Sequence, residues 1–154
     1  MSETQFLLYL KALIWSVFVS YTNTTVQHLA EALNKGSISG DHPELQDTHL
    51  GICLRYFLAE LQDPQERRIL SEALYQVRES LPSLIYKNKV IEVGHYVITA
   101  QPLEQVPDNC YGVVHCLQEQ RIHALFRCPQ KHLIPAIVHP FQIMPVYTLT
   151  IPPE

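Results

Sequence analysis

The spacing of apolar residues changes at Pro82, and this change constrains the fold of the chain more than any other feature. Before Pro82, apolar side chains recur every three or four residues, which is the period of an α-helix packed on one side. After Pro82 they tend to alternate with polar side chains, which is the period of a half-buried β-strand. We therefore predict an α+β protein, with an N-terminal four-helix domain at residues 1–82 joined directly to a small C-terminal antiparallel β-domain at residues 83–154.

The helices of the first part are predicted at residues 4–21, 25–35, 50–61 and 63–81. The first is apolar almost all round, so we expect a helix that is buried on most sides. The second is predicted to begin at Thr24 or Thr25, a preferred N-cap residue type, and to end before Gly36. The fourth begins at Asp63-Pro64, where the aspartate caps the helix and the proline fits its first turn.

The strands of the second part are predicted at residues 90–99, 111–117, 121–127 and 146–151. Prolines divide the region between the last two strands into short, edge-like pieces. Four or five short strands within so few residues predict an SH3-like small barrel or a strongly bent sheet.

Composition excludes several classes of protein. The chain is 47% hydrophobic and 17% charged, against about 25% charged residues in ordinary soluble domains. Intrinsic disorder requires low hydrophobicity and high net charge, so it is excluded. The formal net charge of −4 argues against a general polyanion binder.

The apolar run at residues 6–21 raises the question of a membrane segment. It contains Lys11 and is shorter than the roughly 20 residues that a transmembrane helix needs. A secretory signal would have a basic start and a small-residue cleavage site, whereas this run follows Glu3 and ends at Tyr21. We expect a buried helix, no membrane span and a cytoplasmic protein whose cysteines are thiols.

The second part of the chain is rich in cysteine and histidine. A hairpin with Glu119 and Gln120 at its tip would place Cys116 directly opposite His123, on one face of the sheet. The close pair of cysteine and histidine that follows the hairpin would complete a Cys₂His₂ zinc site, whose ligands would be Cys116, His123, Cys128 and His132. The alternative is that these cysteines are small buried hydrophobes, since the tight ligand spacing of a zinc knuckle is missing.

Catalytic patterns are missing from the sequence. It has no G-x-G-x-x-G, no Walker sequence and no H-E-x-x-H. Cys116 and His123 could be read as a thiolate–imidazolium pair, but a hairpin offers the cysteine neither a helix N-terminus nor an orienting carboxylate. We therefore expect a protein that is not an enzyme and that needs no cofactor, with zinc as the exception.

A nucleic-acid-binding module is an alternative function. Basic side chains interleave with aromatic ones in the second part, and the candidate phosphate contacts are Arg121, Arg127 and Lys131. Residues 83–154 carry five basic and five acidic side chains, so the electrostatic signal is weak.

Surplus apolar residues favour a role in protein–protein contacts. The first helix and the proline-rich segment at residues 133–144 have too few charged side chains to cover their apolar surface. The candidate interface residues in that segment are Leu133, Ile137, Phe141, Ile143 and Met144. Apolar surface that a chain cannot bury itself often meets a partner. We expect a non-enzymatic adaptor, regulator or complex subunit that binds another protein or a second copy of itself.

Overall fold

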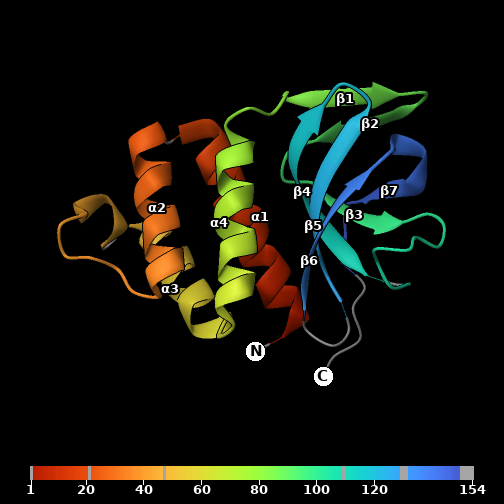
Figure 1. The fold of residues 1–154 in the computed structure, drawn as a ribbon. Coiled ribbons are helices and arrows are strands. Elements are labelled where there is room, and N and C mark those ends of the chain that lie inside the picture. Colours follow the sequence, from red (N-terminus) through yellow and green to blue (C-terminus); the bar gives the residue numbers. More distant parts are fainter. Residues whose placement is uncertain (1, 21, 47, 109, 129–131, 150–154) are drawn as a thin grey trace.

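The computed structural model describes residues 2–20, 22–46, 48–108, 110–128 and 132–149, and it confirms an α+β protein. The helices lie on one side of the molecule and the strands on the other (Figure 1). The α-helices are α1 (Glu3–Ser20), α2 (Asn23–Lys35), α3 (His49–Glu60) and α4 (Pro64–Val77), with short 3₁₀ helices η1 (Pro43–Leu45) and η2 (Pro140–Gln142). The strands are β1 (Ser83–Tyr86), β2 (Lys89–Glu92), β3 (Tyr96–Thr99), β4 (Tyr111–Gln118), β5 (Arg121–Arg127), β6 (Leu133–Val138) and β7 (Ile143–Val146).

Local capping explains where three of the helices begin. Asp63 accepts a hydrogen bond from the Gln65 amide at 2.9 Å, which confirms the predicted start of α4. Thr48 caps α3 in the same way. The predicted N-cap of α2 is wrong by two or three residues, because Thr22 rather than Thr24 or Thr25 has the extended backbone and accepts the capping bond.

The β-half contains an open sheet. Five antiparallel strands lie in the order β6-β5-β4-β3-β7, and β1 pairs with β2 in a separate hairpin. The edge strands β6 and β7 are not paired with each other among the described strands, so an SH3-like barrel is not confirmed. The β4–β5 hairpin has the predicted register, with Cys116 opposite His123, and a bulge between Val114 and Cys116 interrupts it.

Two strand predictions are wrong in detail. The segment at residues 90–99 is divided between β2 and β3, because Gly94 adopts a positive φ of 86° in the turn that joins them. The last described strand ends at Val146, where the prediction had a strand begin, and it pairs with β3 at the sheet edge. Such an edge tolerates Pro145. Residues 150 and 151 of the predicted strand lie outside the described residues.

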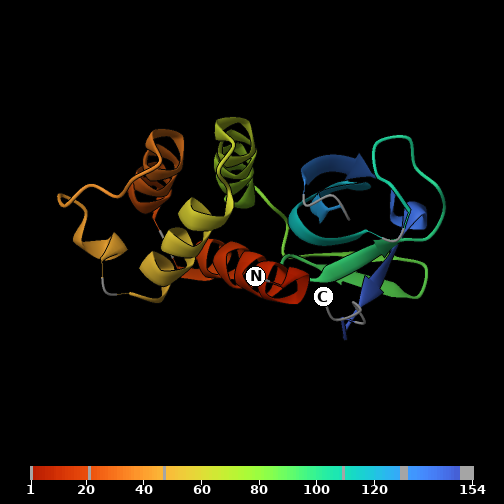
Figure 2. The ribbon, with the colours of Figure 1, turned by 90° about the horizontal axis from the view of Figure 1, so that it is seen from below.

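The helices nearest the sheet are α1 and α4, and both contact β4 (Figure 2). One cluster of buried apolar side chains runs from the helices into the sheet, and it includes Phe6, Leu10, Leu74, Val113 and Phe126. Residues on both sides of Pro82 therefore share a core. A domain boundary at residue 82 stays a prediction.

Helix α1 is less buried than its sequence predicts. Phe6, Leu10 and Val17 lie in the core, but Leu8, Trp15 and Val19 are each about half exposed. Within the described ranges, no helix combines the length and the apolarity needed to cross a membrane.

Candidate functional site

The four predicted zinc ligands form two separate pairs. Cys116 and His123 face each other near the tip of the β4–β5 hairpin. Cys128 and His132 lie at the other end of β5, where the His132 amide donates to the Cys128 sulfur at 3.3 Å. Five residues of extended chain separate His123 from Cys128, which is about 16 Å. His132 contacts Cys128 through its backbone amide, whereas its ring Nδ1 lies 3.4 Å from Glu66 Oε1. The structure therefore does not bring the four predicted ligands together.

The bulge places a further histidine, His115, in the interface between β4 and α4. Its side chain is buried, and its Nε2 donates to Gln76 Oε1 at 2.7 Å. Burial lowers the pKa of His115 to about 3, with the neighbouring His123 adding to the effect. The ring is therefore neutral near pH 7. His115 is not among the predicted site residues, because the extra residue of a bulge is not encoded in the alternation of a strand.

The candidate phosphate-binding residues do not form a common basic surface in the described structure. Arg121 is exposed, but Arg127 is buried and paired with Glu3 and Glu60. The interpretation of Arg127 as a phosphate contact is thereby corrected, since its guanidinium is already neutralised within the fold. Lys131 lies outside the described residues.

The candidate interface residues of the second part divide into two groups. Leu133 and Ile143 are buried in the core, so their side chains are not available to a partner in this structure. Ile137, Phe141 and Met144 are each about half exposed.

A second exposed apolar surface lies on α1 and is formed by Leu8, Trp15 and Val19, here called the α1 stripe. These residues are seven and four positions apart, so they lie on one side of the helix. The tryptophan is 47% exposed and borders the turn at Gly94, where a Cβ would lie 3.7 Å from two Trp15 carbons.

The stripe is flanked by part of the β-half. His95 follows Gly94 and makes an edge contact with the ring of Tyr147, whose residue is 79% exposed. The Lys11 ammonium group lies over the ring of Tyr96, 4.6 Å from its centroid. The exposed side chains of Trp15 and Tyr147 therefore both lie close to the turn at Gly94 and His95.

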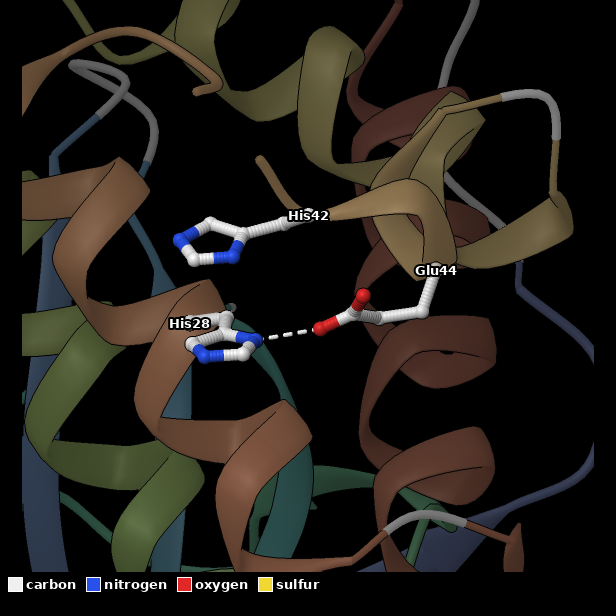
Figure 3. Close-up of side chains that lie close together, drawn as sticks. All are labelled: His28, His42 and Glu44. Carbon is white, nitrogen blue, oxygen red and sulfur yellow. Dashed lines mark hydrogen bonds and ion pairs between the residues drawn. The ribbon is translucent and has the colours of Figure 1, made fainter. Parts of the chain in front are cut away.

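A cluster of polar side chains joins α2 to the segment that follows it (Figure 3). His28 comes from α2, His42 immediately precedes η1, and Glu44 lies within η1. The two imidazole rings stack, with centroids 3.7 Å apart and planes inclined by 14°. His28 Nδ1 donates a hydrogen bond to Glu44 Oε1. This bond is the main reason that the pKa of Glu44 is lowered, so the carboxylate is favoured.

Local structure fixes the positions of these side chains. Glu31 lies one helical turn after His28, and its Oε2 is 3.9 Å from His42 Nε2. The Thr48 hydroxyl donates to the Glu44 carbonyl at 2.8 Å, which ties η1 to the start of α3. This cluster is not among the sites predicted from the sequence, although the pairs His28/Glu31 and His42/Glu44 are visible there as a signal. The loop between them has no periodicity from which its path could be predicted.

No family model, curated protein or solved structure matches this chain.

Proposed function

We propose that this chain is a non-enzymatic subunit or regulator that binds a protein partner through the α1 stripe. The observation that carries the proposal is the half-exposed Trp15, which lies between two further large apolar side chains on the same side of one helix. Tryptophan is enriched among the residues that contribute most to protein–protein binding.

The energetics of the stripe support a covered state. Full burial of a large apolar side chain contributes about 1.5–3 kcal/mol, and each residue of the stripe has about half of its surface still exposed. A partner that covers Leu8, Trp15 and Val19 would therefore gain a few kcal/mol before the costs of association. Lys11 lies between Leu8 and Trp15 in the sequence and offers a charged group beside the stripe.

A non-enzymatic role is also supported by the state of Cys116. Its side chain is buried, and burial raises the pKa of the thiol. A nucleophilic cysteine needs the opposite shift, toward the thiolate.

The emission of the chain's single tryptophan tests the proposal directly, because Trp15 is itself part of the stripe. Binding of a partner buries the indole, so its emission moves to shorter wavelength. Self-association would produce this shift as the concentration of the chain is raised, together with a larger mass in sedimentation equilibrium. A different partner would leave the isolated chain monomeric and would cause the shift when the purified partner is added.

Two pairs of substitutions separate the exposed surfaces. Leu8→Gln with Val19→Gln changes the α1 stripe and keeps the fluorescent reporter. Ile137→Gln with Met144→Gln instead changes exposed apolar residues of β6 and β7. Ile52→Gln is the matched control, since Ile52 is equally exposed but lies on α3. We expect binding to be lost in the first pair and kept in the control. The proposal would be refuted if two results were found together. The chain would be monomeric at all concentrations, and the same proteins would co-purify with the Leu8→Gln/Val19→Gln variant and with the Ile52→Gln control.

A further inference from the structure

We propose that His28, His42 and Glu44 form a binding site for one zinc-class divalent cation, with Glu31 as an additional carboxylate. This site is independent of the α1 stripe and would hold the α2–α3 connection against α2. Each of these three residues offers one possible ligand atom, and the three atoms lie within 4.8 Å of one another. Among the described histidine, cysteine, aspartate and glutamate residues, this is the group that meets this condition.

The donor atoms are already close to the spacing that a metal ion requires. With zinc bonds of about 2.0–2.1 Å, the ligand atoms of a tetrahedral site lie about 3.4 Å apart. His28 Nδ1 and Glu44 Oε1 are in direct contact, so they must separate slightly. Glu31 Oε2 and His42 Nε2 are 3.9 Å apart and need to approach by a few tenths of an ångström.

The chemistry of the ligands selects the ion. Two imidazoles with one carboxylate are typical zinc ligands, and these three protein ligands leave the fourth position for Glu31 or for water. Magnesium and calcium prefer sites made of oxygen alone, so neither ion matches two nitrogen donors. About a fifth of the surface of each histidine side chain is exposed to solvent, so an ion can reach the cluster.

Binding requires a defined local movement. The lone pair of an imidazole nitrogen lies in the plane of its ring, and in the stack the two planes are nearly parallel. The rings must therefore tilt out of the stack before both can point at one ion. We expect His42 to be the ring that tilts, because it lies in the connection before η1, whereas His28 belongs to α2.

The competing explanation is a purely structural contact. The hydrogen bond between His28 and Glu44, together with the stacking of His42, would hold the loop without any ion. The two explanations differ in whether the full chain binds one equivalent of metal and in which substitutions abolish that binding.

Cobalt(II) is the probe, because it replaces zinc and its visible spectrum reports the ligand geometry. The full chain is first treated with a chelator and then titrated with cobalt chloride and, separately, with zinc chloride in a calorimeter. We expect one ion per chain and the intense visible bands of a four- or five-coordinate nitrogen–oxygen site. We expect no thiolate-to-cobalt charge-transfer band. Such a band would instead assign the metal to the buried cysteines and overturn the proposal.

Substitutions identify the ligands. His28→Ala and His42→Ala are each expected to weaken zinc binding at least about tenfold, since even residues that only support a ligand cost this much. Glu44→Gln keeps an acceptor for His28 but removes the charge, and it is expected to weaken binding as well. His49→Ala is the control, because His49 is an exposed histidine of α3 outside the cluster. Magnesium chloride is expected to give no binding at the same concentrations.

Thermal unfolding provides a second measurement that does not depend on colour. An ion that binds the folded chain raises its Tm, and at a zinc concentration one hundred times Kd we expect a shift of roughly 5 °C or more. The shift should be lost in His42→Ala and kept in His49→Ala. Equal zinc binding and an equal Tm shift in these two variants, or no stoichiometric binding by the unsubstituted chain, would overturn the proposal and leave the cluster as a structural contact.

Discussion

Arg127 donates a hydrogen bond from Nε to Glu3 Oε2 at 3.1 Å, and this ion pair joins residues that are 124 positions apart. The Arg127 side chain is 3% exposed, and a second carboxylate, Glu60, lies 3.7 Å from its Nη2. The guanidinium also lies over the ring of Phe6, 3.9 Å from the centroid. One buried cation thus connects the end of β5 to the first turn of α1 and to the end of α3.

Removal of this cation should destabilise the chain strongly. We expect Arg127→Met to lower the free energy of unfolding by about 3 kcal/mol, because Glu3 and Glu60 stay largely buried but lose the cation that they share. Urea unfolding at pH 7 measures the change. Arg121→Met is the matched control on the same strand, and as a substitution of an exposed side chain it should change stability by less than about 0.5 kcal/mol. Equal stability of the two variants would contradict this role of Arg127.

Features encoded by neighbouring residues could be predicted from the sequence. The N-cap at Asp63 and the pairing of Cys116 with His123 each depend on residues that are close together in the chain. The structure confirms both predictions. The sequence predicts the N-cap of α2 too late in the chain, because Thr22, Thr24 and Thr25 offer the same hydroxyl group. Which threonine caps depends on the backbone that leads into the helix.

Features that depend on distant contacts could not be predicted. Arg127 carries the same charge as Arg121, and the alternation of β5 does not reveal that Glu3 and Glu60 will meet it. Likewise, α1 was expected to be buried because its residues are apolar on all sides. The elements of the described structure cover one side of that helix and leave Trp15 half exposed.

His115 makes stability sensitive to acid. Its pKa falls from an ordinary value near 6.5 to about 3 on folding, so between these values the unfolded chain binds more protons than the folded chain. Its contribution to stability is fully present above about pH 6.5 and is lost as the pH falls toward 3, by up to about 1.4 kcal/mol per pH unit. Burial lowers the pKa of the neighbouring His123 as well, which acts in the same direction.

Urea midpoints at pH 7.0, 5.5 and 4.5 measure this dependence. His115→Gln removes the titrating group, so the loss of stability between pH 7.0 and 4.5 should be smaller than in the unsubstituted chain, whatever the stability of the variant at pH 7. His49→Gln changes an exposed histidine and should retain the full loss. An unchanged pH dependence in His115→Gln would contradict the assignment.

The cysteines should be unreactive in the folded chain. All four are buried free thiols, and burial raises the pKa of both Cys53 and Cys110 to about 11. A chromogenic disulfide reagent at pH 8 should therefore react slowly with Cys53, Cys110 and Cys116, and rapidly with every cysteine after unfolding. Ile52→Cys provides the comparison, because position 52 is exposed beside buried Cys53 and should add one fast thiol. Equally fast reaction of Cys53 would show that α3 opens readily.

Gly112 should be intolerant of a side chain because the ring of Phe126 packs directly against it. A Cβ at position 112 would lie 2.8 Å from Phe126 Cδ1, and overpacking of this kind costs about 1–3 kcal/mol. Gly40→Ala is the matched control, since nothing lies within 4 Å of its Cβ and its backbone is not left-handed. That variant should be as stable as the unsubstituted chain, or more stable by up to about 1 kcal/mol.

A double substitution shows whether the clash itself is responsible. Phe126→Leu should destabilise the chain alone, but it removes the ring atoms nearest to position 112. In combination with Gly112→Ala, the two changes should therefore cost less than their sum, by about 0.5 kcal/mol or more in urea unfolding. Strict additivity would mean that the cost of Gly112→Ala arises from the backbone of β4 rather than from contact with Phe126.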